Sequence, residues 1–395
     1  MPILGSSSSG GSRPTTPTIG TVTADNASAS VPFTASSYVG KGTITYTATS
    51  SPGGFTGTGS SPITVSGLTN GTSYTFTVVG ATNYGISSEV SGASNSVTPG
   101  IPQGGYTLGG GTSTLFSNIT KLSFTDETTS TISATLSYSA NYLGGFANSG
   151  TAGYTAGRTD SLVINKLTFT TEARSTLSAQ LYIYAEGVMG MANSGTAGYF
   201  GGGYDGPFNV AYISHINKIT FSNDSRSLIA AQLTEAAAYG AGFANSGTAG
   251  YFTSQMGGFY NSTIQKILFS TDAKTVLSAT LTDATSNAGA MANSGTAGYI
   301  MGGSTGSLIS RIDKLTFSGE SRSTLGSTLS VNIRYTGAYA KSGTAGYNPG
   351  GRPNAGGGTA QIDKVLFSND TRTTLSATLP ASRFGAAGFA NSGAL

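Results

Sequence analysis

The feature that most constrains this chain is a sequence repeat that runs from about residue 100 to the end. A Gly-Tyr pair recurs with its tyrosine at positions 106, 154, 199, 251, 299 and 347. An Ile-x-Lys-[Leu/Ile/Val]-x-Phe element recurs with its lysine at positions 121, 166, 218, 266, 314 and 364. Both series count six units, spaced by 45 to 52 residues. Such a period is typical of proteins in which one supersecondary unit is repeated and each copy packs against the next.

Each unit is predicted to contain four β-strands. The first ends in GFAN or GMAN, an NSGT turn follows, and the second strand carries AGY. The third strand reads INKLTFS and the fourth STLSAQL, with variants in each unit. In one third strand Leu167 and Phe169 share a face, while Ile164, Lys166 and Thr168 share the other. We therefore expect a sheet packed between two neighbours, with the aliphatic part of the lysine lying along its surface.

The composition favours an all-β fold. The chain of 395 residues has 59 glycines and only 9% charged residues, while Ser, Thr, Ala and Asn are abundant. Such usage favours short strands joined by tight turns over helices. An aromatic content of 10% argues against a disordered chain.

The repeats resemble kelch repeats along residues 104–395. The resemblance lies in a Gly-Tyr strand that leads to a Gly-Gly pair such as Gly202–Gly203, then an aromatic-bearing strand, then a leucine-bearing strand. It implies a six-bladed β-propeller over residues 100–395. The blades are expected near residues 104–140, 141–185, 186–236, 237–284, 285–333 and 334–383. Leucine replaces the tryptophan of the fourth kelch strand, so the partner functions of kelch proteins are not implied.

The first unit lacks a first strand, and the end of the chain carries one. Residues 384–395 read FGAAGFANSGAL, which repeats the first strand and turn of the other units. We expect this segment to pair beside Tyr106 and to close the ring. Closure would remove the exposed sheet edges that favour aggregation.

The N-terminal part of the chain is organised differently. Residues 1–16 are rich in Gly, Ser, Pro and Thr and are expected to form a flexible arm. Over residues 17–99, alternating segments such as TITYTAT and SYTFTVVGAT indicate the strands of a small β-sandwich. Leu68, Gly71 and Tyr74 resemble the tyrosine-corner region of fibronectin type III domains.

The resemblance implies a fibronectin type III-like sandwich in which Phe76 and Val78 face inward. The chain has no tryptophan, so Phe33 or Tyr46 is expected to fill the space of the tryptophan usual in this family. Domains of this kind serve mostly as spacers or docking units.

Charge and residue usage argue against several classes of function. The formal net charge is +3 and no basic run is present, so nucleic-acid binding is not expected. No apolar run of 18 residues is present, which argues against membrane insertion. The absence of cysteine excludes disulfides and thiolate metal sites. The segment MPILGSSSSGGSRPTTP lacks the features of a secretory signal, and we interpret the initial Met as a native start.

The sequence carries no recognisable catalytic motif, and we expect neither an enzyme nor a cofactor or metal. His215 is the single histidine and has no nucleophile elbow near it. A glycosidase would use two carboxylates, but the Trp-containing Asp box of six-bladed sialidases has no counterpart. The acids outside the repeated turns are Asp160, Asp205, Glu235 and Asp283. Asp313 and Asp363 precede repeat lysines and are expected to pair with neighbouring strands.

A second repeated turn carries an acid six residues after each repeat lysine and, in five units, a base two residues later. The pairs are Glu172/Arg174, Asp224/Arg226, Asp272/Lys274, Glu320/Arg322 and Asp370/Arg372, while the first unit has Glu127 and Thr129. We interpret these turns as structural. An Asp or Asn bonds its own backbone there, the base reaches the neighbouring blade, and an exposed pair contributes only about 0–1 kcal/mol.

The connections between second and third strands differ in every unit. Loops placed by a rigid scaffold commonly carry binding residues, and aromatic side chains there suit stacking on sugar rings or anchoring a protein partner. The alternative is that these aromatic residues only cover the blade ends. The candidate ligand- or receptor-binding residues are Phe116, Tyr204, Phe208, Tyr212, Phe259 and Tyr260.

A fibronectin type III-like module followed by uncharged β repeats resembles structural proteins of bacteriophage virions. The resemblance implies a tail fibre or appendage whose propeller binds a host-surface glycan or protein. The arm and sandwich would contact other virion proteins, and a homo-oligomer is compatible with this role. Localisation in the virion agrees with the missing signal, because virions assemble in the cytoplasm. A capsid decoration protein, a bacterial surface adhesin and an enzyme remain the alternatives.

Overall fold

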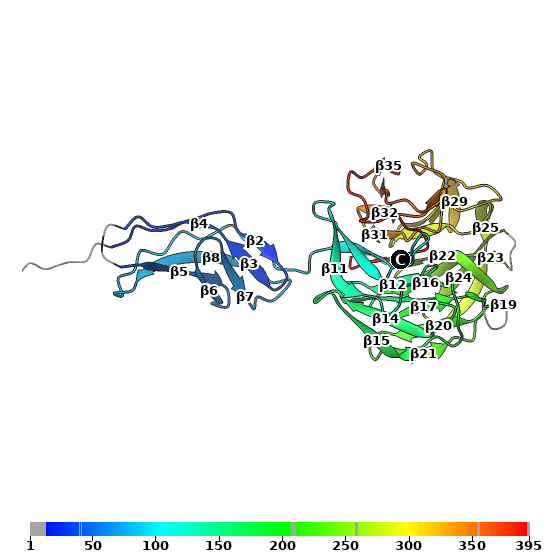
Figure 1. Cartoon of the computed structure of the whole chain (residues 1–395), viewed down its shortest axis with the longest axis horizontal. Coiled ribbons are helices and arrows are strands. Elements are labelled where there is room, and N and C mark those ends of the chain that lie inside the picture. The colour runs from blue at the N-terminus through cyan, green and yellow to red at the C-terminus, as the bar shows by residue number, and fades with distance from the viewer. Residues whose placement is uncertain are drawn as a thin grey trace, which may run out of the picture. The chain divides into compact units, whose positions relative to one another are not determined.

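A computed structural model describes residues 13–38, 40, 42–206, 211–256, 260–353 and 356–392. The chain divides into two compact units between Pro102 and Gln103 (Figure 1). Within those ranges the chain forms strands and turns and no helix, which confirms the prediction of an all-β fold.

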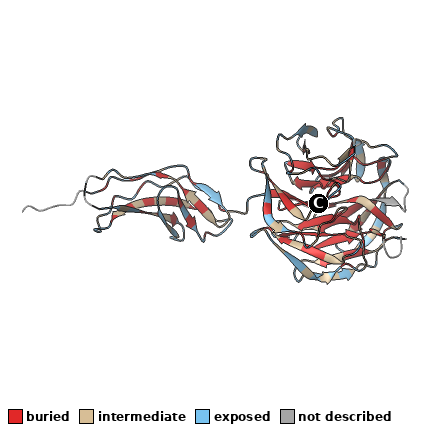
Figure 2. Ribbon diagram, in the orientation of Figure 1, coloured by how far each residue is buried: buried red, intermediate tan, exposed pale blue. Residues whose placement is uncertain are grey.

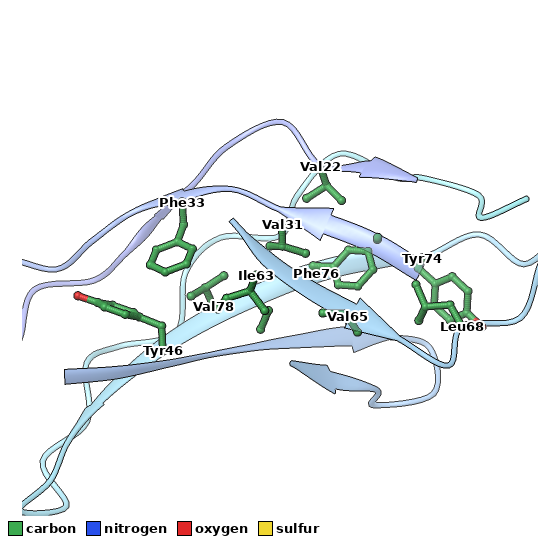
Figure 3. Packing of buried hydrophobic residues seen from close by; sticks show 12 residues of the cluster. Val22, Val31, Phe33, Tyr46, Ile63, Val65, Leu68, Tyr74, Phe76 and Val78 are labelled. Carbon is green, nitrogen blue, oxygen red and sulfur yellow. The ribbon is translucent and has the colours of Figure 1, made fainter. Parts of the chain in front are cut away.

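The first unit contains two three-stranded antiparallel sheets, ordered β2-β3-β7 and β6-β5-β8, and the two-stranded pair β1-β4. Its strands are β1 (Thr18–Ile19), β2 (Thr23–Asp25), β3 (Ser28–Val31), β4 (Phe33–Thr34), β5 (Ile44–Ser51), β6 (Thr56–Gly59), β7 (Ile63–Ser66) and β8 (Thr75–Thr82). Alternate residues of β3, β5, β7 and β8 are buried. Because β-strand side chains alternate between faces, one face of each strand supplies the common core drawn in Figure 3.

The expected tyrosine corner is present in the first unit. The Thr69 N–H donates a hydrogen bond to the Tyr74 hydroxyl oxygen at 3.0 Å. Phe76 is 1% exposed and Val78 is fully buried, so both face inward as predicted. Phe33 and Tyr46 both enter the core, with ring centroids 4.7 Å apart.

In the described part of the second unit, the chain forms six four-stranded antiparallel sheets, numbered here sheets 1 to 6 (Figure 1). Sheet 1 contains β9 (Gly104–Leu108), β10 (Asn118–Ser123), β11 (Thr129–Thr135) and β36 (Ala387–Ala390). Sheet 2 contains β12 (Gly144–Asn148), β13 (Ala152–Ala156), β14 (Val163–Thr168) and β15 (Ala173–Gln180). Sheet 3 contains β16 (Met189–Asn193), β17 (Ala197–Gly201), β20 (Ile216–Thr220) and β21 (Ser225–Leu228). Sheet 4 contains β22 (Ala237–Asn245), β23 (Ala249–Met256), β24 (Asn261–Leu268) and β25 (Ala273–Thr285).

Sheet 5 contains β26 (Gly289–Asn293), β27 (Ala297–Met301), β28 (Ile312–Thr316) and β29 (Ser321–Thr324). Sheet 6 contains β31 (Tyr339–Lys341), β32 (Ala345–Pro349), β34 (Ile362–Leu366) and β35 (Thr371–Thr374). Two short pairs lie in the connections: β18 (Tyr204–Asp205) with β19 (Ala211–Tyr212), and β30 (Ile333–Arg334) with β33 (Arg352–Pro353). Burial decreases from the first strand of each sheet to the fourth (Figure 2).

The end of the chain completes sheet 1. Strand β36 pairs antiparallel with β9, and Phe389 lies opposite Tyr106. The predicted pairing beside Tyr106 is therefore confirmed. The first strands of consecutive sheets contact one another, and β36 contacts both β31 and β12. The sheets thus form a closed, propeller-like arrangement.

The innermost strands approach closely because their facing residues are small. A Cβ atom on Gly190 would lie 2.1 Å from the carbonyl oxygen of Gly145, and one on Gly388 would lie 2.2 Å from that of Gly337. The space left between these strands measures only about 70 Å³. Around the axis of the second unit the backbones of neighbouring sheets are therefore in close contact.

Aromatic stacking joins each sheet to the next. The Gly-Tyr tyrosine of one sheet stacks on the repeat phenylalanine of the following sheet, with ring centroids 5.0 to 5.4 Å apart. The pairs are Tyr106–Phe169, Tyr154–Phe221, Tyr199–Phe269, Tyr251–Phe317, Tyr299–Phe367 and Tyr347–Phe124. The last pair links sheet 6 to sheet 1, so every sheet-to-sheet boundary carries the same contact.

The repeat lysine and the turn acid form a second link at each boundary. In sheet 2, Tyr154 and Lys166 lie opposite one another on adjacent strands. The Lys166 ammonium pairs with Asp224 of sheet 3 at 2.6 Å, and the Tyr154 hydroxyl donates to the same carboxylate at 2.8 Å. The corresponding ion pairs are Lys121–Glu172, Lys218–Asp272, Lys266–Glu320, Lys314–Asp370 and Lys364–Glu127.

These contacts correct the interpretation of the acid-x-base turns as weak exposed pairs. The acid is bound by the preceding sheet, and all six acids adopt positive φ values between 46° and 58°. The residue before the acid bonds the local backbone where it is Asn, as the Ser225 N–H shows by donating to Asn223 Oδ1 at 3.1 Å. The base does reach its neighbour, because Arg174 Nε donates to the Thr135 carbonyl at 3.0 Å.

Candidate recognition surface

The second unit has two different ends, which we call the constant end and the variable end. The constant end carries the NSGT turns and the acid-bearing turns. The variable end carries the loops between second and third strands and the connections from one sheet to the next. The distinction matters because a recognition surface needs side chains that are not already engaged in holding the scaffold together.

At the constant end the NSGT turns hydrogen-bond to one another. The Ser194 N–H donates to Ser246 Oγ at 3.0 Å, and the Gly247 N–H donates to Asn193 Oδ1 at 2.8 Å. The same two bonds join every successive pair of turns from sheet 2 to sheet 6. The repeated Asn, Ser and Gly are therefore explained by contacts between turns.

At the variable end six residues at equivalent positions meet around the axis, with φ values between 54° and 68°. They are Tyr142, Gly187, Tyr239, Asn287, Tyr335 and Gly385. The N–H of each of the last five donates to the carbonyl of the one before it, at 2.8 to 2.9 Å. The Leu143 N–H donates to the Gly385 carbonyl at 3.2 Å, which completes the circle.

Tyr142, Tyr239 and Tyr335, here called the axial tyrosines, meet at the centre of this circle. Their ring centroids are 4.8 to 6.2 Å apart, and all three side chains are partly exposed. The Tyr239 hydroxyl donates to the Glu186 carboxylate. Burial raises the pKa of all three phenols, so they are neutral hydrogen-bond donors at neutral pH. Tyrosine seldom adopts a positive φ, and such strain commonly persists at functional sites.

An arginine pair lies beside the axial tyrosines. Arg334 and Arg352 are directly opposite one another in the short pair β30–β33. The Arg334 guanidinium lies 5.0 Å from the Tyr335 ring centroid, and that of Arg352 lies 5.2 Å from the Phe384 ring centroid. Aromatic faces therefore hold two positive charges on one side of the variable end.

The arginine pair lines a cavity of about 370 Å³. Connections of sheets 4, 5 and 6 surround it, and its remaining lining residues are Tyr260, Ser304, Gly306, Ser307, Leu308, Pro353 and Gly356. By contrast, the depression over the axial tyrosines measures only about 60 Å³. The cavity is the larger of these two hollows and the one that contains a charged pair.

The six residues predicted to bind a ligand or receptor lie in different surroundings. Tyr260 is 44% exposed and lines the arginine-pair cavity. Tyr204 and Tyr212 lie opposite one another in β18–β19, with ring centroids 5.0 Å apart. Phe116 packs against the fully buried Arg383, whose guanidinium carbon lies 4.9 Å from its ring centroid. Phe208 and Phe259 lie outside the described residues.

Tyr204 is connected to the axis through the backbone. The Tyr204 N–H donates to the Glu186 carbonyl at 2.8 Å, and the Glu186 N–H donates back to the Tyr204 carbonyl at 3.1 Å. The Glu186 carboxylate in turn accepts from the Tyr239 hydroxyl. Tyr204 and Tyr239 are thus linked by one intervening residue.

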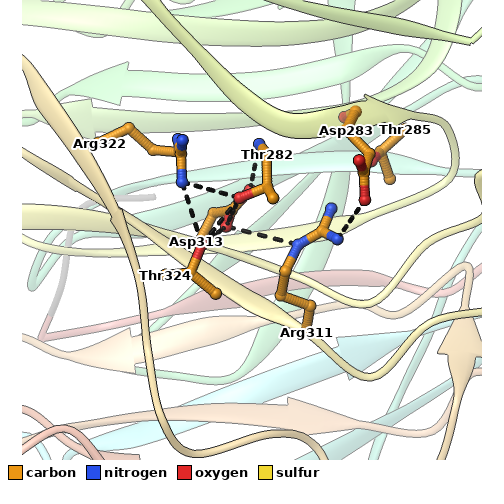
Figure 4. A network of polar contacts seen from close by, with 7 residues as sticks. All are labelled: Thr282, Asp283, Thr285, Arg311, Asp313, Arg322 and Thr324. Atoms are coloured by element: carbon orange, nitrogen blue, oxygen red, sulfur yellow. Dashed lines mark hydrogen bonds and ion pairs between the residues drawn. The ribbon is translucent and has the colours of Figure 1, made fainter.

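Two of the acids considered for catalysis form ion pairs, while Glu235 is exposed. Asp283 pairs with Arg311 at 2.6 Å, and Asp160 pairs with Arg158 (Figure 4 shows the former). Asp313 accepts hydrogen bonds from the backbone and hydroxyl of Thr282 on the neighbouring sheet, at 2.9 and 2.7 Å (Figure 4). The expected pairing of Asp313 with a neighbouring strand is therefore confirmed.

Asp363 repeats this arrangement, accepting hydrogen bonds from the Ser330 N–H and hydroxyl at 2.8 Å each.

The imidazole of His215 packs against Tyr182, with ring centroids 5.1 Å apart. Among the described residues, no group of three His, Cys, Asp or Glu side chains is placed to hold a metal ion. Nor does that part of the chain contain a helix of sufficient length and apolarity to cross a membrane.

The axial tyrosines and the arginine pair were not predicted from the sequence. The axial position lies six residues before the Asn or Lys of each NSGT-type turn, where the six units carry Tyr, Gly, Tyr, Asn, Tyr and Gly. Alignment of the units on that turn would have revealed the alternation. The pairing of Arg334 with Arg352 depends on a two-residue strand pair, which leaves no periodic pattern in the sequence.

Neither a protein-family model nor a curated protein matches this chain. The solved structure of YjhT, which has a β-propeller-like fold, is similar to it with a TM-score of 0.53 and 12% sequence identity. The similarity covers 68% of this chain and 97% of that chain. At this identity it bears on the fold alone, and it supports the propeller-like description of the second unit.

Proposed function

We propose that this chain is a structural attachment protein of a bacteriophage virion, a tail fibre or appendage. In this proposal the second unit is a six-bladed propeller closed by β36, with sheets 1 to 6 as its blades. The first unit is a fibronectin type III-like sandwich that, with the N-terminal arm, contacts other virion proteins. The propeller presents its variable end to a receptor or glycan on the host surface.

The observation that carries the proposal is the difference between the two ends of the second unit. The constant end uses its repeated polar side chains in bonds between turns, such as Gly247 N–H to Asn193 Oδ1 at 2.8 Å. The variable end carries a different loop in each unit, and partly exposed aromatic and charged residues gather on its connections. A rigid scaffold with one diversified end suits recognition, because loops placed by such a scaffold commonly carry binding residues.

Several interactions favour a scaffold that withstands conditions outside a cell. Each sheet boundary carries a tyrosine–phenylalanine stack and a lysine–acid pair. The boundary between sheets 6 and 1 carries the same two contacts. The chain has no cysteine, so this cohesion does not depend on the redox state of the surroundings. These properties suit a virion component, which is assembled in the cytoplasm and works outside.

The proposal predicts that the protein is part of the particle and competes for its receptor. Cryo-electron microscopy of the intact virion should place the chain at the tail or an appendage. The full chain, added to host cells before infection, should reduce phage adsorption. A position on the capsid would instead indicate a decoration protein, and absence from the particle together with presence on the bacterial surface would indicate an adhesin.

Variants test whether the variable end makes the contact. We expect simultaneous replacement of Tyr204, Phe208 and Tyr260 by alanine to abolish the reduction of adsorption, because large aromatic side chains dominate binding energy at interfaces. A control variant replaces Tyr84 of the first unit, which is 67% exposed, by alanine. Undiminished competition by the triple variant, with its melting temperature unchanged, would contradict recognition through these loops.

A further inference from the structure

The arginine pair has no carboxylate partner. All 16 Asp and Glu side chains lie in the described part of the chain, and none is within 4.0 Å of the charged nitrogens of Arg334 or Arg352. The Arg334 Nε is buried and has no hydrogen-bond partner there. The Glu186 carboxylate adds to the effect of burial in raising the pKa of the neighbouring tyrosines. It already accepts a hydrogen bond from the Tyr239 hydroxyl.

Two like charges directly opposite one another on paired strands are destabilising. Most other bases of this unit, Arg226 and Lys341 apart, are paired with carboxylates or bonded to carbonyls and hydroxyls, as in Lys166 with Asp224 and Arg311 with Asp283. Each guanidinium of the arginine pair lies over an aromatic ring, but no carboxylate of the chain compensates the repulsion between the two charges. An anion placed between the two guanidiniums would remove the repulsion and satisfy the buried Nε donor, because guanidinium groups bind carboxylates in a bidentate geometry.

The surroundings of the pair resemble a small-molecule site. A volume of about 370 Å³ lies within the range of roughly 300–1,000 Å³ found for ligand pockets. Tyr260 presents a 44% exposed ring at the cavity, and Ser304 and Ser307 contribute to its lining. An aromatic face beside hydroxyl groups suits the apolar face and hydroxyl groups of a sugar ring.

From this arrangement we infer that the cavity between sheets 4, 5 and 6 binds an acidic saccharide of the uronic-acid type. The sugar carboxylate lies between Arg334 and Arg352, and the sugar ring packs on Tyr260. This inference rests on the proposed function and specifies its ligand class. Host-surface polysaccharides that carry uronic acids would supply such a residue.

The experiment measures binding of a uronic-acid trisaccharide to the full chain by isothermal titration calorimetry. The neutral trisaccharide of the same linkage, a sulfated one and a glutamate-rich peptide serve as comparison ligands. We expect the uronic-acid trisaccharide to bind and the neutral one to bind at least about tenfold more weakly, since a charge-assisted bidentate contact is lost. The affinity should also fall with added salt.

Variants assign the binding to the cavity. Arg334→Gln and Arg352→Gln should each weaken uronic-acid binding by about tenfold or more, and Tyr260→Ala should weaken it by a smaller factor. The control Arg158→Gln makes the same charge change at an arginine already paired with Asp160, and it should leave the affinity unchanged. Circular dichroism and the melting temperature establish that each variant is folded.

Three results would overturn the inference: no saccharide binding, equal binding of the neutral trisaccharide, or unchanged affinity in both arginine variants. Preference for the sulfated trisaccharide or the peptide would overturn the uronic-acid assignment. The proposed function fails separately. A chain that binds the uronic-acid trisaccharide but is absent from virions contradicts the virion role, whereas a chain that blocks adsorption without binding this sugar contradicts only the inference.

Discussion

Glu127 shows how much one side chain contributes to the second unit. Its carboxylate belongs to sheet 1 but is bound by Lys364 and by the Tyr347 hydroxyl of sheet 6, the latter at 3.0 Å. The base expected two residues after it is Thr129, so the sequence pattern made this turn look irregular. The partners of this acid lie across the sheet boundary, not within the turn.

We expect Glu127→Gln to lower the free energy of unfolding by about 1–3 kcal/mol, because the partly buried Lys364 ammonium would lose its counter-charge. Glu235→Gln, the same change at an exposed acid of the same unit, should alter it by less than about 0.5 kcal/mol. Thermal unfolding of both variants provides the measurement. Equal melting temperatures would show that the Lys364–Glu127 pair adds no net stability.

The six Gly-Tyr tyrosines predict a response to alkaline pH. Burial is the largest cause that raises the pKa of Tyr106, Tyr154, Tyr199, Tyr251, Tyr299 and Tyr347, and the bound carboxylates raise it further. In the unfolded chain a tyrosine ionises near pH 10. Their stabilising contribution is therefore complete below about pH 10 and decreases as the pH rises towards the folded-state pKa.

Tyrosinate absorbance and circular dichroism, followed together against pH, check this expectation. The phenols of these six residues should ionise together with the loss of β-structure rather than before it. Exposed tyrosines such as Tyr84, which is 67% exposed, should ionise earlier and provide the internal reference. Complete tyrosinate absorbance in a protein with unchanged circular dichroism would disprove the linkage.

At the scale of single elements, the first strand and its turn have separate tasks. The turn bonds the next turn through its Asn, Ser and Gly, as in Gly195 N–H to Asn148 Oδ1 at 2.8 Å. The strand meets its neighbours through glycine and alanine, so that the backbones of adjacent sheets touch. The repeated motif is thus needed at both the constant end and the axis.

Gly190→Ala should destabilise the second unit by about 1–3 kcal/mol, as overpacking in a core does. The added Cβ would lie 2.1 Å from the Gly145 carbonyl oxygen, which cannot withdraw without moving a neighbouring sheet. Gly326→Ala is the matched control, since no heavy atom lies within 4 Å of its Cβ position. Chemical denaturation of both variants is the measurement, and equal midpoints would contradict close packing at the axis.

At the scale of the whole molecule, β36 decides whether the second unit is a ring. Removal of residues 384–395 would leave β9 as an unpaired edge strand and separate sheet 1 from sheet 6 on the inner side. We expect a lower melting temperature and aggregation on warming, because unpaired edges template association. An unchanged melting temperature would refute closure by this strand.

A milder variant addresses the same closure without removing the strand. Phe389 is fully buried and its ring centroid lies 6.0 Å from those of Tyr106 and Phe169. Phe389→Ala should reduce stability by about 3–5 kcal/mol, the range for deletion of a buried phenylalanine side chain. Light scattering during thermal unfolding would then report whether a weakened closure also increases aggregation.

Much of the fold could be predicted because its signals are local and repeated. Tyr74 and the residues before it identified the tyrosine corner, and the spacing of the Gly-Tyr and lysine elements identified the strands. The last twelve residues identified the strand that pairs with β9. The candidate site was predicted less well: Tyr260 lines the cavity, whereas Phe116 packs on the buried Arg383.

The sequence by itself determined the strands, their order within each sheet and the completion of sheet 1, because hydrophobic alternation and turn residues act over a few neighbouring positions. Only the tertiary structure decided what meets across sheets. It gave Glu127 its partner in sheet 6, brought the axial tyrosines together and set Arg334 opposite Arg352. These contacts depend on the angle and distance between packed sheets, which a one-dimensional period does not encode.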